Sequence, residues 1–319
     1  MSTMTLPQPA TARRTRFKRA TPDPMRLTSD DLTILRHIAK HRFLRSTHLL
    51  RLMSDRSMKK LIERLGALYH NGYVDRPRAQ LDYYAAAGSS PMVYALGNRG
   101  ALVLAEHDMD RAQIDWTWKN RTVGRPFVEH ALLTADLMIA TQQATRIRSD
   151  VRLIEADEIL AAAPEETRKG QNPFKLTTRM IRDGRSIDLA VIPDALFGLD
   201  FTSERKQKYF FVEADRATMP IVRSALEQTS YYRKLLAYLA GGGKSNAFGK
   251  HFGIDNFRVL TVTTSAKRTA SMLEALRTAT HGKGSQQFLF IDRTTLRASF
   301  DLFSLDWISG KGDPIRLFD

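Results

Sequence analysis

Residues 185–215 read RSIDLAVIPDALFGLDFTSERKQKYFFVEAD. Residues 186–192 form a short apolar run that stops just before Asp194, and residues 208–214 form a second run rich in β-branched and aromatic side chains. Both runs have the composition and length of β-strands. Because the segment between them is charged and has turn chemistry, we expect the two strands to form a hairpin.

This hairpin carries three acidic residues near one end. Glu213 and Asp215 are two positions apart, so their side chains leave the same face of a strand. We expect Asp194, at the end of the neighbouring strand, to lie beside them. Three carboxylates at one sheet edge repel one another unless protons or a cation compensate their charge, so they are the first candidates for a functional site.

Composition limits the classes of protein to consider. A chain of 319 residues with 43% hydrophobic residues is expected to form two domains. It contains no cysteine, which excludes disulfides and thiolate metal sites. No apolar run is long enough for a membrane span, and the basic N-terminus has no apolar secretory signal, so we expect a cytoplasmic protein without membrane contact.

The net charge of +15 indicates a polyanionic partner, and nucleic acid is the commonest one. Residues 1–122 hold 21 Lys and Arg against 11 Asp and Glu, a net charge of +10. The first 26 residues contain four prolines and a cluster of cations that includes Arg13, Arg14 and Arg16. We predict a disordered basic arm over residues 1–26, which either follows DNA phosphates or serves only as a solvated tail.

Residues 27–108 predict a small domain of three helices and two strands. Helical apolar stripes begin near residues 28, 46 and 56, and strands are expected around residues 73–74 and 91–96. This order, with the strings GYV at residues 72–74 and YALGNRG at residues 94–100, resembles the winged helix-turn-helix.

The resemblance implies double-stranded DNA as the partner, with the third helix in the major groove and the wing on the backbone. A protein-interaction module with a solvated basic face is the alternative. The implied contacts, besides those of the arm, are Arg56, Ser57, Lys59, Lys60 and Arg64 on the helix and Arg76 and Arg78 in the wing.

Residues 109–125 are expected to be a linker, and residues 126–319 a second domain. Its predicted order begins with a long helix from Pro126 and a strand at residues 151–155, followed by a loop with a helical turn at residues 156–184. The hairpin comes next, then a helix over residues 221–240 and further strands and helices to the C-terminus.

That order of helix, three strands, helix and strand resembles the PD-(D/E)XK core of restriction-endonuclease-like proteins. The fold class is therefore α+β and α/β, a winged helix-turn-helix followed by an endonuclease-like αβββαβ domain. The whole chain looks more specifically like the replication-relaxation family of plasmid and mobile-element proteins, which is distantly similar to one class of plasmid relaxases. The resemblance is carried by residues 127–130 (FVEH), by Pro193-Asp194, by residues 211–218 (FVEADRAT), and by Lys234 with Tyr238.

The resemblance implies a site chemistry. Asp194 and Glu213 would hold Mg²⁺ or Mn²⁺, with Glu129 completing the site. The lysine that normally ends the endonuclease motif is replaced by Asp215, and Lys234 from the following helix could supply its ammonium group. Asp215 could instead form a buried ion pair with Lys234 or an arginine.

Two functions therefore remain open. The first is a DNA-binding protein of a plasmid or mobile element that acts in replication, mobilisation or transcription control and has a degenerate endonuclease-like domain. The second is a metal-dependent DNA-nicking endonuclease or relaxase that uses Asp194, Glu213, Asp215 and Lys234. The missing motif lysine favours the first. A palindromic target would imply a homodimer.

Overall fold

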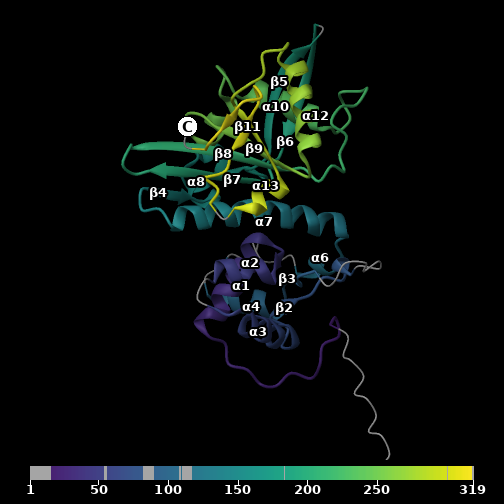
Figure 1. The fold of residues 1–319 in the computed structure, drawn as a ribbon, viewed down its shortest axis with the longest axis vertical. Helices are drawn as coiled ribbons and strands as arrows, with labels where there is room; N and C mark the ends of the chain where they lie inside the picture. Colours follow the sequence, from purple (N-terminus) through teal and green to yellow (C-terminus); the bar gives the residue numbers. More distant parts are fainter. Residues whose placement is uncertain are drawn as a thin grey trace, which may run out of the picture. The chain divides into compact units, whose positions relative to one another are not determined.

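A computed structural model describes residues 16–53, 56–81, 90–107, 109, 117–182, 184–299 and 301–317. The chain divides into two compact units, Met1–Arg125 and Pro126–Asp319 (Figure 1). Arg13 and Arg14 of the expected basic arm lie outside the described residues. Among the helices that are described, none combines the length and the hydropathy needed to cross a membrane.

The first unit is a small helical unit with a three-stranded antiparallel sheet in the order β1-β3-β2. Its elements are α1 (Ser29–His41), β1 (Leu44–Arg45), α2 (Ser46–Leu52), α3 (Met58–His70), β2 (Val74–Asp75), the 3-10 helix η1 (Arg78–Gln80), β3 (Val93–Leu96), α4 (Asn98–Glu106) and α6 (Thr117–Thr122).

Local sequence signals explain where its helices begin. Thr28 and Asp31 form a capping box at the start of α1, and the Ser57 side chain caps α3. The apolar stripes of both helices face inward, because their core positions are completely buried: Ile34, Leu35 and Ile38 on α1, and Leu61, Leu65 and Leu68 on α3.

The described part of the N-terminal arm contacts this unit. Arg19 donates a hydrogen bond to the Val74 carbonyl at 3.2 Å, and the Ala20 amide donates to His70 Nδ1 at 3.0 Å. Arg76 donates to the Arg16 carbonyl at 2.8 Å. Residues from Arg16 onward in the segment expected to be a free arm are therefore held against α3 and β2.

The segment expected to be a linker also contributes to the first unit. Its residues 117–122 form α6. Arg121 Nε donates to the Asp75 carboxylate at 2.9 Å, and Arg42 Nε donates to the Asn120 side chain at 2.8 Å. These polar contacts attach α6 to β2 and to the end of α1.

The second unit is built on a mixed seven-stranded sheet in the order β12-β11-β10-β9-β8-β7-β4. A separate two-stranded sheet consists of β5 and β6. The strands are β4 (Val151–Ile154), β5 (Leu176–Arg182), β6 (Arg185–Val191), β7 (Ala195–Phe201), β8 (Lys206–Ala214), β9 (Arg258–Thr263), β10 (Phe288–Asp292), β11 (Trp307–Ser309) and β12 (Pro314–Ile315). The helices are α7 (Arg125–Arg146), α8 (Ala156–Ala162), α9 (Glu165–Lys169), α10 (Tyr231–Gly241), α11 (Ala247–Phe252), α12 (Ala266–Ala279) and α13 (Arg293–Ala298).

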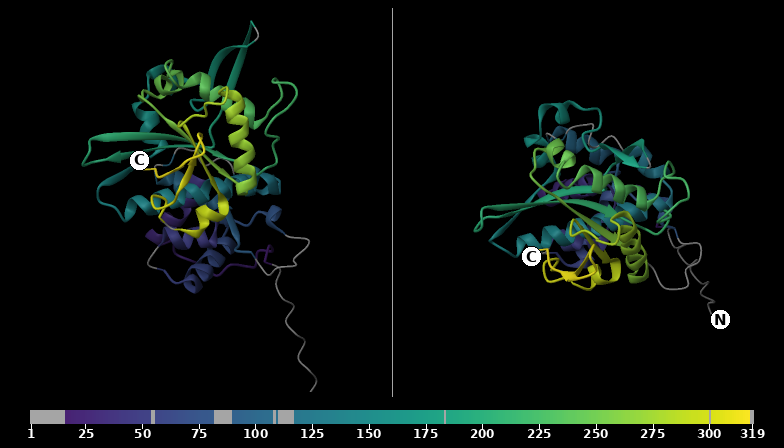
Figure 2. Two further views of the ribbon diagram at one scale, coloured as in Figure 1. Left: turned by 45° about the horizontal axis from the view of Figure 1, so that its top comes forward. Right: turned by 90° about the horizontal axis from the view of Figure 1, so that it is seen from above.

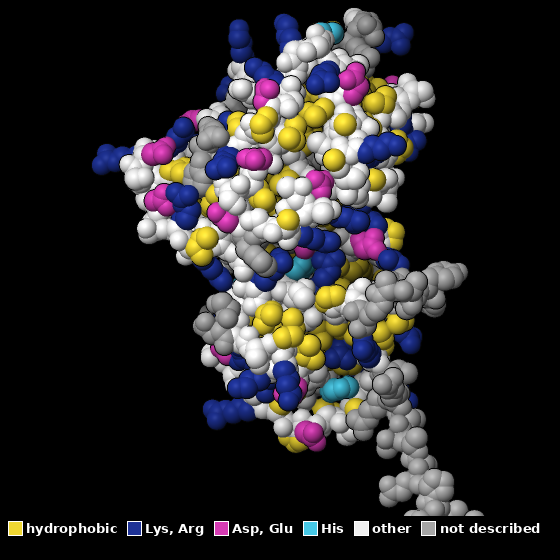
Figure 3. Space-filling model, viewed as in Figure 1, with side chains coloured by type: hydrophobic (Ala, Val, Ile, Leu, Met, Phe, Trp, Pro, Cys, Tyr) yellow, Lys and Arg dark blue, Asp and Glu magenta, His cyan; other side chains and the backbone are white. Residues whose placement is uncertain are grey.

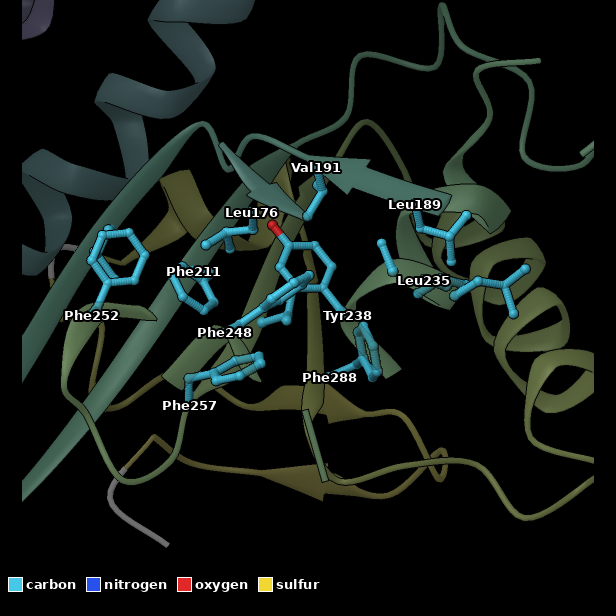
Figure 4. Packing of buried hydrophobic residues seen from close by; sticks show 14 of the residues in the cluster. Leu176, Leu189, Val191, Phe211, Leu235, Tyr238, Phe248, Phe252, Phe257 and Phe288 are labelled. Carbon is cyan, nitrogen blue, oxygen red and sulfur yellow. The ribbon is translucent and has the colours of Figure 1, made fainter. Parts of the chain in front are cut away.

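Helices cover both faces of this sheet (Figures 1 and 2). One face packs on α7 through a core that includes Leu133, Leu137 and Phe210. The other face packs on α8, α10, α11 and α12 through an aromatic cluster centred on Phe211 and Tyr238 (Figure 4). The strand β8 contributes alternate residues to the two cores, so it is an interior strand buried on both faces.

The observed hairpin differs from the expected one in its first strand. The strand that pairs with β8 is β7, whereas residues 186–191 belong to β6 and pair with β5. The prediction of a hairpin made from residues 186–192 is therefore wrong, because the apolar run after Asp194 is the one buried on both sides. The turn between β7 and β8 does fall in the charged segment after Phe201.

Two further expectations need correction. We expect a loop with a helical turn over residues 156–184, but the segment contains two short helices, α8 and α9, and the strand β5, because Ile159 and Leu176 are buried in the core. The helix expected over residues 221–240 begins only at Tyr231. Ser230 caps it, and the carbonyls of Leu226 and Thr229 accept arginine hydrogen bonds in place of helical ones.

We expect Gly100→Ala to destabilise the first unit. A Cβ at this position would lie 2.2 Å from the Tyr73 carbonyl oxygen, so the backbone of α4 or of the segment before β2 would have to move. The expected loss is about 2 kcal/mol in the free energy of unfolding, measured by urea denaturation.

Gly66→Ala, in the middle of α3, is the matched control. The nearest atom to its added Cβ would be 3.9 Å away, so the better helix propensity of alanine should stabilise the unit by up to about 1 kcal/mol. Equal effects of the two substitutions would contradict the close packing of α4 against Tyr73.

Candidate functional site

The candidate site lies where β7 begins and β8 ends. Ala195 is paired with Val212 across the ladder, so Asp194 lies next to Glu213. The Asp194 amide donates to the Val212 carbonyl at 2.9 Å, and the Ala214 amide donates to Asp194 Oδ2 at 2.8 Å. The antiparallel register therefore brings together two acids that are separated by a whole hairpin in the sequence.

Glu213 is held by two residues of α10. Its side chain is buried, with 2% of the residue exposed. The Tyr238 hydroxyl donates to Oε1 at 2.7 Å, and the Lys234 ammonium forms an ion pair with Oε2. Lys234 and Tyr238 are four residues apart, so both face the sheet from one side of the helix.

The aromatic cluster fixes the position of Tyr238. Its ring centroid lies 5.9 Å from that of Phe211 and 6.0 Å from that of Phe248. Figure 4 shows this ring in the middle of the buried side chains that separate α10 from the sheet. Hydrophobic packing thus places the hydroxyl where it can bind the buried carboxylate of Glu213.

Asp194 is shared between the sheet and α7. His130 Nε2 lies 2.9 Å from Asp194 Oδ1, while Oδ2 accepts from the Ala214 amide. The His130 side chain is 36% exposed, and that of Asp194 is 17% exposed. The hydrogen bond with Asp194 raises the pKa of His130, although burial opposes this shift.

The electrostatics of the two acids differ. Burial raises the pKa of Glu213 to about 7, against the lowering effect of the Lys234 charge. Burial also acts to raise the pKa of Asp194, but the His130 hydrogen bond and the Lys234 charge outweigh it, and the net shift is downward. Burial acts to lower the pKa of Lys234, but the negative charges of Glu213 and Asp194 outweigh burial, so the net shift of its pKa is upward. Asp194 is therefore the permanently ionised acid and Glu213 the one that titrates near neutral pH.

Asp215 points to the same side of the sheet as Glu213 but binds a different helix. Arg268 of α12 donates two hydrogen bonds to its carboxylate, at 2.9 and 3.0 Å. The Thr263 hydroxyl donates a third at 2.8 Å. This two-pronged ion pair is the arginine alternative that the sequence left open for Asp215.

Glu129 also forms an ion pair, with Arg216 just beyond β8. Arg216 donates in addition to the Pro126 carbonyl at 2.7 Å. The two contacts hold the first turn of α7 against the segment that follows Asp215.

Every oxygen of the two central carboxylates accepts a hydrogen bond from the protein. Asp194 accepts from His130 and Ala214, and Glu213 accepts from Tyr238 and Lys234. In the part of the chain that the structure describes, there is no group of three or more His, Cys, Asp or Glu side chains that could hold a metal ion.

Some of the residues expected to bind DNA are exposed, and others form ion pairs within the protein. Ser57, Lys59 and Lys60 are exposed at the start of α3. Arg64 instead donates to the buried Asp31 carboxylate, with Nε 2.7 Å from Oδ1, and Arg56 forms an ion pair with Asp30. Both arginines attach α3 to the first turn of α1.

The two arginines expected in a wing divide in the same way. Arg78 is exposed on η1. Arg76 is half-buried, and its guanidinium carbon lies 4.2 Å from the centre of the Tyr69 ring. Residues 82–89, between η1 and β3, lie outside the described residues, and Arg16 is exposed where the description begins.

Three residues of the acidic site were missed from the sequence as site residues. His130 follows Glu129 directly in the quartet FVEH, and Tyr238 follows Lys234 by one helical turn. Both positions could have been found from spacing on a helix. Arg268 gives no local signal, because it lies 53 residues from Asp215 and meets it only through the parallel pairing of β8 with β9.

We expect Glu213 to make stability depend on pH. Its pKa is about 7 in the folded protein against an ordinary value of 4.5, so the folded state binds the proton more tightly. This contribution is fully present below pH 4.5 and is lost as the pH rises to about 7. Wild type should therefore lose stability relative to Glu213→Gln across this window, by up to about 1.4 kcal/mol per pH unit.

Denaturant unfolding of both proteins at a series of pH values measures this difference. His130 is present in both proteins, so its own titration largely cancels. A difference between the two proteins that stays constant with pH would contradict the raised pKa.

We expect Arg268→Leu to be strongly destabilising. The Asp215 side chain is only 5% exposed, so removal of the guanidinium would leave a buried carboxylate without its cation. The expected loss is about 3 kcal/mol or more in the free energy of unfolding. Arg179→Leu is the control, since its ion pair with Asp188 is exposed, and little change is expected there. Similar losses in both variants would rule out a special role for the Asp215 ion pair.

Comparison with known proteins gives one match. The family described as replication-relaxation matches residues 35–248, which include α3 of the first unit and Asp194, Glu213 and Lys234 of the second. No curated protein and no solved structure matches the chain. Since the match spans more than half of the 319 residues, the protein belongs to the replication-relaxation family, as the sequence resemblance indicated.

Proposed function

We propose that this protein binds double-stranded DNA through α3 and acts in the replication or mobilisation of a plasmid or mobile element, or in its transcriptional control. The observation that carries this proposal is the exposed basic start of α3. Lys59 and Lys60 have no ion-pair partner among the described residues, while the opposite face of the helix is buried. Two adjacent exposed cations at the start of a helix suit a phosphate backbone.

The arrangement of the first unit supports the same proposal. Its order of α1, β1, α2, α3, β2 and β3, with β3 between the other two strands, is the order expected of a winged helix. In that fold the third helix enters the major groove. The ion pairs of Arg56 and Arg64 with α1 then hold this helix in place and leave its exposed start for DNA.

For the second unit, we propose an endonuclease-like core that is kept for assembly or binding. Apart from the inserted α8, α9, β5, β6 and α11, the order α7, β4, β7, β8, α10 and β9, with β9 parallel to β8, agrees with the αβββαβ order expected from the sequence. The topology supports only the fold of this unit. The chemistry of the site depends on its side chains.

The side chains at the site do not fit a divalent cation in this arrangement. All four oxygens of Asp194 and Glu213 accept protein hydrogen bonds, and the Lys234 ammonium already neutralises Glu213. A metal would have to displace these donors. Lys234 thus supplies at Glu213 the positive charge that a metal supplies in an active enzyme, and His130 occupies one oxygen of Asp194.

The alternative function, a metal-dependent DNA-nicking enzyme, is favoured by one observation. Asp194, Glu213 and Lys234 converge at one sheet end, and each lowers or raises the pKa of the others. These are the residue types that a nuclease of this kind requires.

Metal titration separates the two functions. We expect millimolar Mg²⁺ or Mn²⁺ to leave the melting temperature unchanged, because an ion stabilises a protein only if it binds the folded state. Supercoiled plasmid incubated with the protein and either ion should stay intact. A rise in melting temperature that Asp194→Asn removes, together with nicking, would establish the enzyme instead.

Charge reversal tests the DNA-binding proposal. We expect Lys59→Glu with Lys60→Glu to abolish binding to a mixed-sequence duplex, measured by fluorescence anisotropy at low salt. Wild-type binding should weaken with salt with a log–log slope of about −0.9 per phosphate contact. The matched control reverses the exposed Arg205 and Lys206 at the turn between β7 and β8 and should retain binding. An equal loss of DNA affinity in both variants would show that the effect depends on the net charge of the protein and not on α3.

A further inference from the structure

The outward face of α3 carries an acidic residue among cations. Leu61, Leu65 and Leu68 are completely buried, and they define the inward face of the helix. Glu63 is two residues from both Leu61 and Leu65, which corresponds to about 200° of rotation around a helix. Glu63 is therefore at the centre of the exposed face, and Lys59 precedes it on that face by one turn.

Exposed cations lie on both the helix and the segment beside it. Lys59 and Lys60 are exposed in the turn before Glu63. Arg26 is also exposed, and it lies beside the helix because its carbonyl accepts a hydrogen bond from Arg64 Nη2 at 2.9 Å. On the face of the first unit that Figure 3 displays, dark blue side chains are likewise more frequent than magenta ones. Phosphates are therefore attracted to the surroundings of Glu63.

Glu63 itself is not neutralised within the protein. It is exposed, and in the part of the chain that the structure describes its carboxylate forms no ion pair. Close to DNA phosphates such a carboxylate is repelled, so it weakens binding unless it accepts a hydrogen bond from a base. In the major groove a carboxylate accepts from the N4 amino group of cytosine, whereas the amino group of adenine lies next to an acceptor nitrogen.

The next turn of α3 permits a close approach to the bases. Gly66 follows Glu63 by three residues, so it lies on the same face. An added Cβ at Gly66 would be 3.9 Å from the nearest atom, so packing within the protein does not require glycine there. Glycine inside a helix is less stable than alanine. What it provides at this position is room for the backbone of α3 to come near the base edges.

We propose that Glu63 is a base-reading residue, whose carboxylate accepts a hydrogen bond from cytosine N4 in the major groove of a DNA duplex. Lys59, Lys60 and Arg26 bind neighbouring phosphates and hold α3 in place. This inference rests on the proposed function, since it names a base that the α3 contact distinguishes. Phosphate contacts carry no sequence information, so the acid and not the cations sets the base preference.

Selection from a random-sequence duplex library with the full chain tests this inference. Wild type should enrich duplexes with cytosine at one fixed position. In Glu63→Gln the side-chain amide pairs with both N6 and N7 of adenine, so the base enriched at that position should change from cytosine to adenine. Glu106→Gln is the matched control, because it makes the same change at an exposed position of α4, and it should enrich the wild-type sequence.

Affinity measurements give the size of the preference. Replacing the cytosine pair of the selected duplex by a thymine pair should weaken wild-type binding about ten-fold, with a smaller effect on Glu63→Gln. The log–log salt slope should be the same in wild type and Glu63→Gln, because no phosphate contact is removed. Lys59→Gln with Lys60→Gln should make the slope shallower by about 1.8, because two phosphate contacts are lost.

The outcomes separate this inference from the proposed function. If wild type binds no duplex even at low salt, both fail. If wild type binds but enriches no cytosine, or if Glu63→Gln enriches the same sequence as wild type, Glu63 does not read a base and the proposed function stands. Equal changes in the Glu63 and Glu106 variants would attribute the effect to net charge and overturn the inference. Both residues are exposed, so unchanged melting temperatures should show that the variants are folded.

Discussion

The buried carboxylate of Glu213 is the constraint on which the second unit depends. It lies at the end of the interior strand β8, where both faces of the sheet are covered, and an unpaired charge there would cost several kcal/mol or more. The protein meets this cost with the Lys234 ammonium and the Tyr238 hydroxyl, both from α10. The helix must therefore lie in one register against the sheet, and the aromatic cluster around Tyr238 packs in the only arrangement that keeps both donors on Glu213.

The neighbouring acids are also paired with cations from other elements. Glu129 with Arg216, Glu213 with Lys234, and Asp215 with Arg268 are three ion pairs that attach α7, α10 and α12 to one end of the sheet. Each joins a helix to β8 or to the residues that follow it. Each of these acids therefore has its own cation. Because Glu213 and Asp215 are paired separately, their mutual repulsion is reduced. In an open site the same acids would form a catalytic cluster.

The sequence predicted the position of the acids better than their partners. The spacing of Glu213 and Asp215 predicted a shared strand face, and both do point to the α10 and α12 side. Asp194 was expected beside Glu213, and it lies there, although it precedes β7 instead of ending the strand of residues 186–191. The wrong strand was assigned because short apolar runs are hard to tell apart. The sequences of β6 and β7 are similar in composition, and only the tertiary packing decides which of them joins the seven-stranded sheet. The mixed sheet flanked by helices was predicted, while the start of α10 depended on Ser230 and on arginine contacts that no periodicity reveals.

The sequence named Lys234 as a cation of the site, but it could not assign a partner to each acid, because ion pairs depend on the geometry of the finished fold. Lys234 is 21 residues from Glu213 and Arg268 is 53 residues from Asp215, and many arginines and lysines lie closer in sequence. Arginine suits Asp215, since its planar group can satisfy two oxygens and still reach the Met219 carbonyl. Lysine suits Glu213, because Tyr238 already occupies one oxygen and only a single point charge is needed on the other. Lys234 of α10 therefore provides the ammonium group that the motif lysine would have provided. It pairs with Glu213, whose other oxygen already accepts a hydrogen bond from Tyr238. This distribution of donors favours a core retained for its architecture over one retained for cleavage.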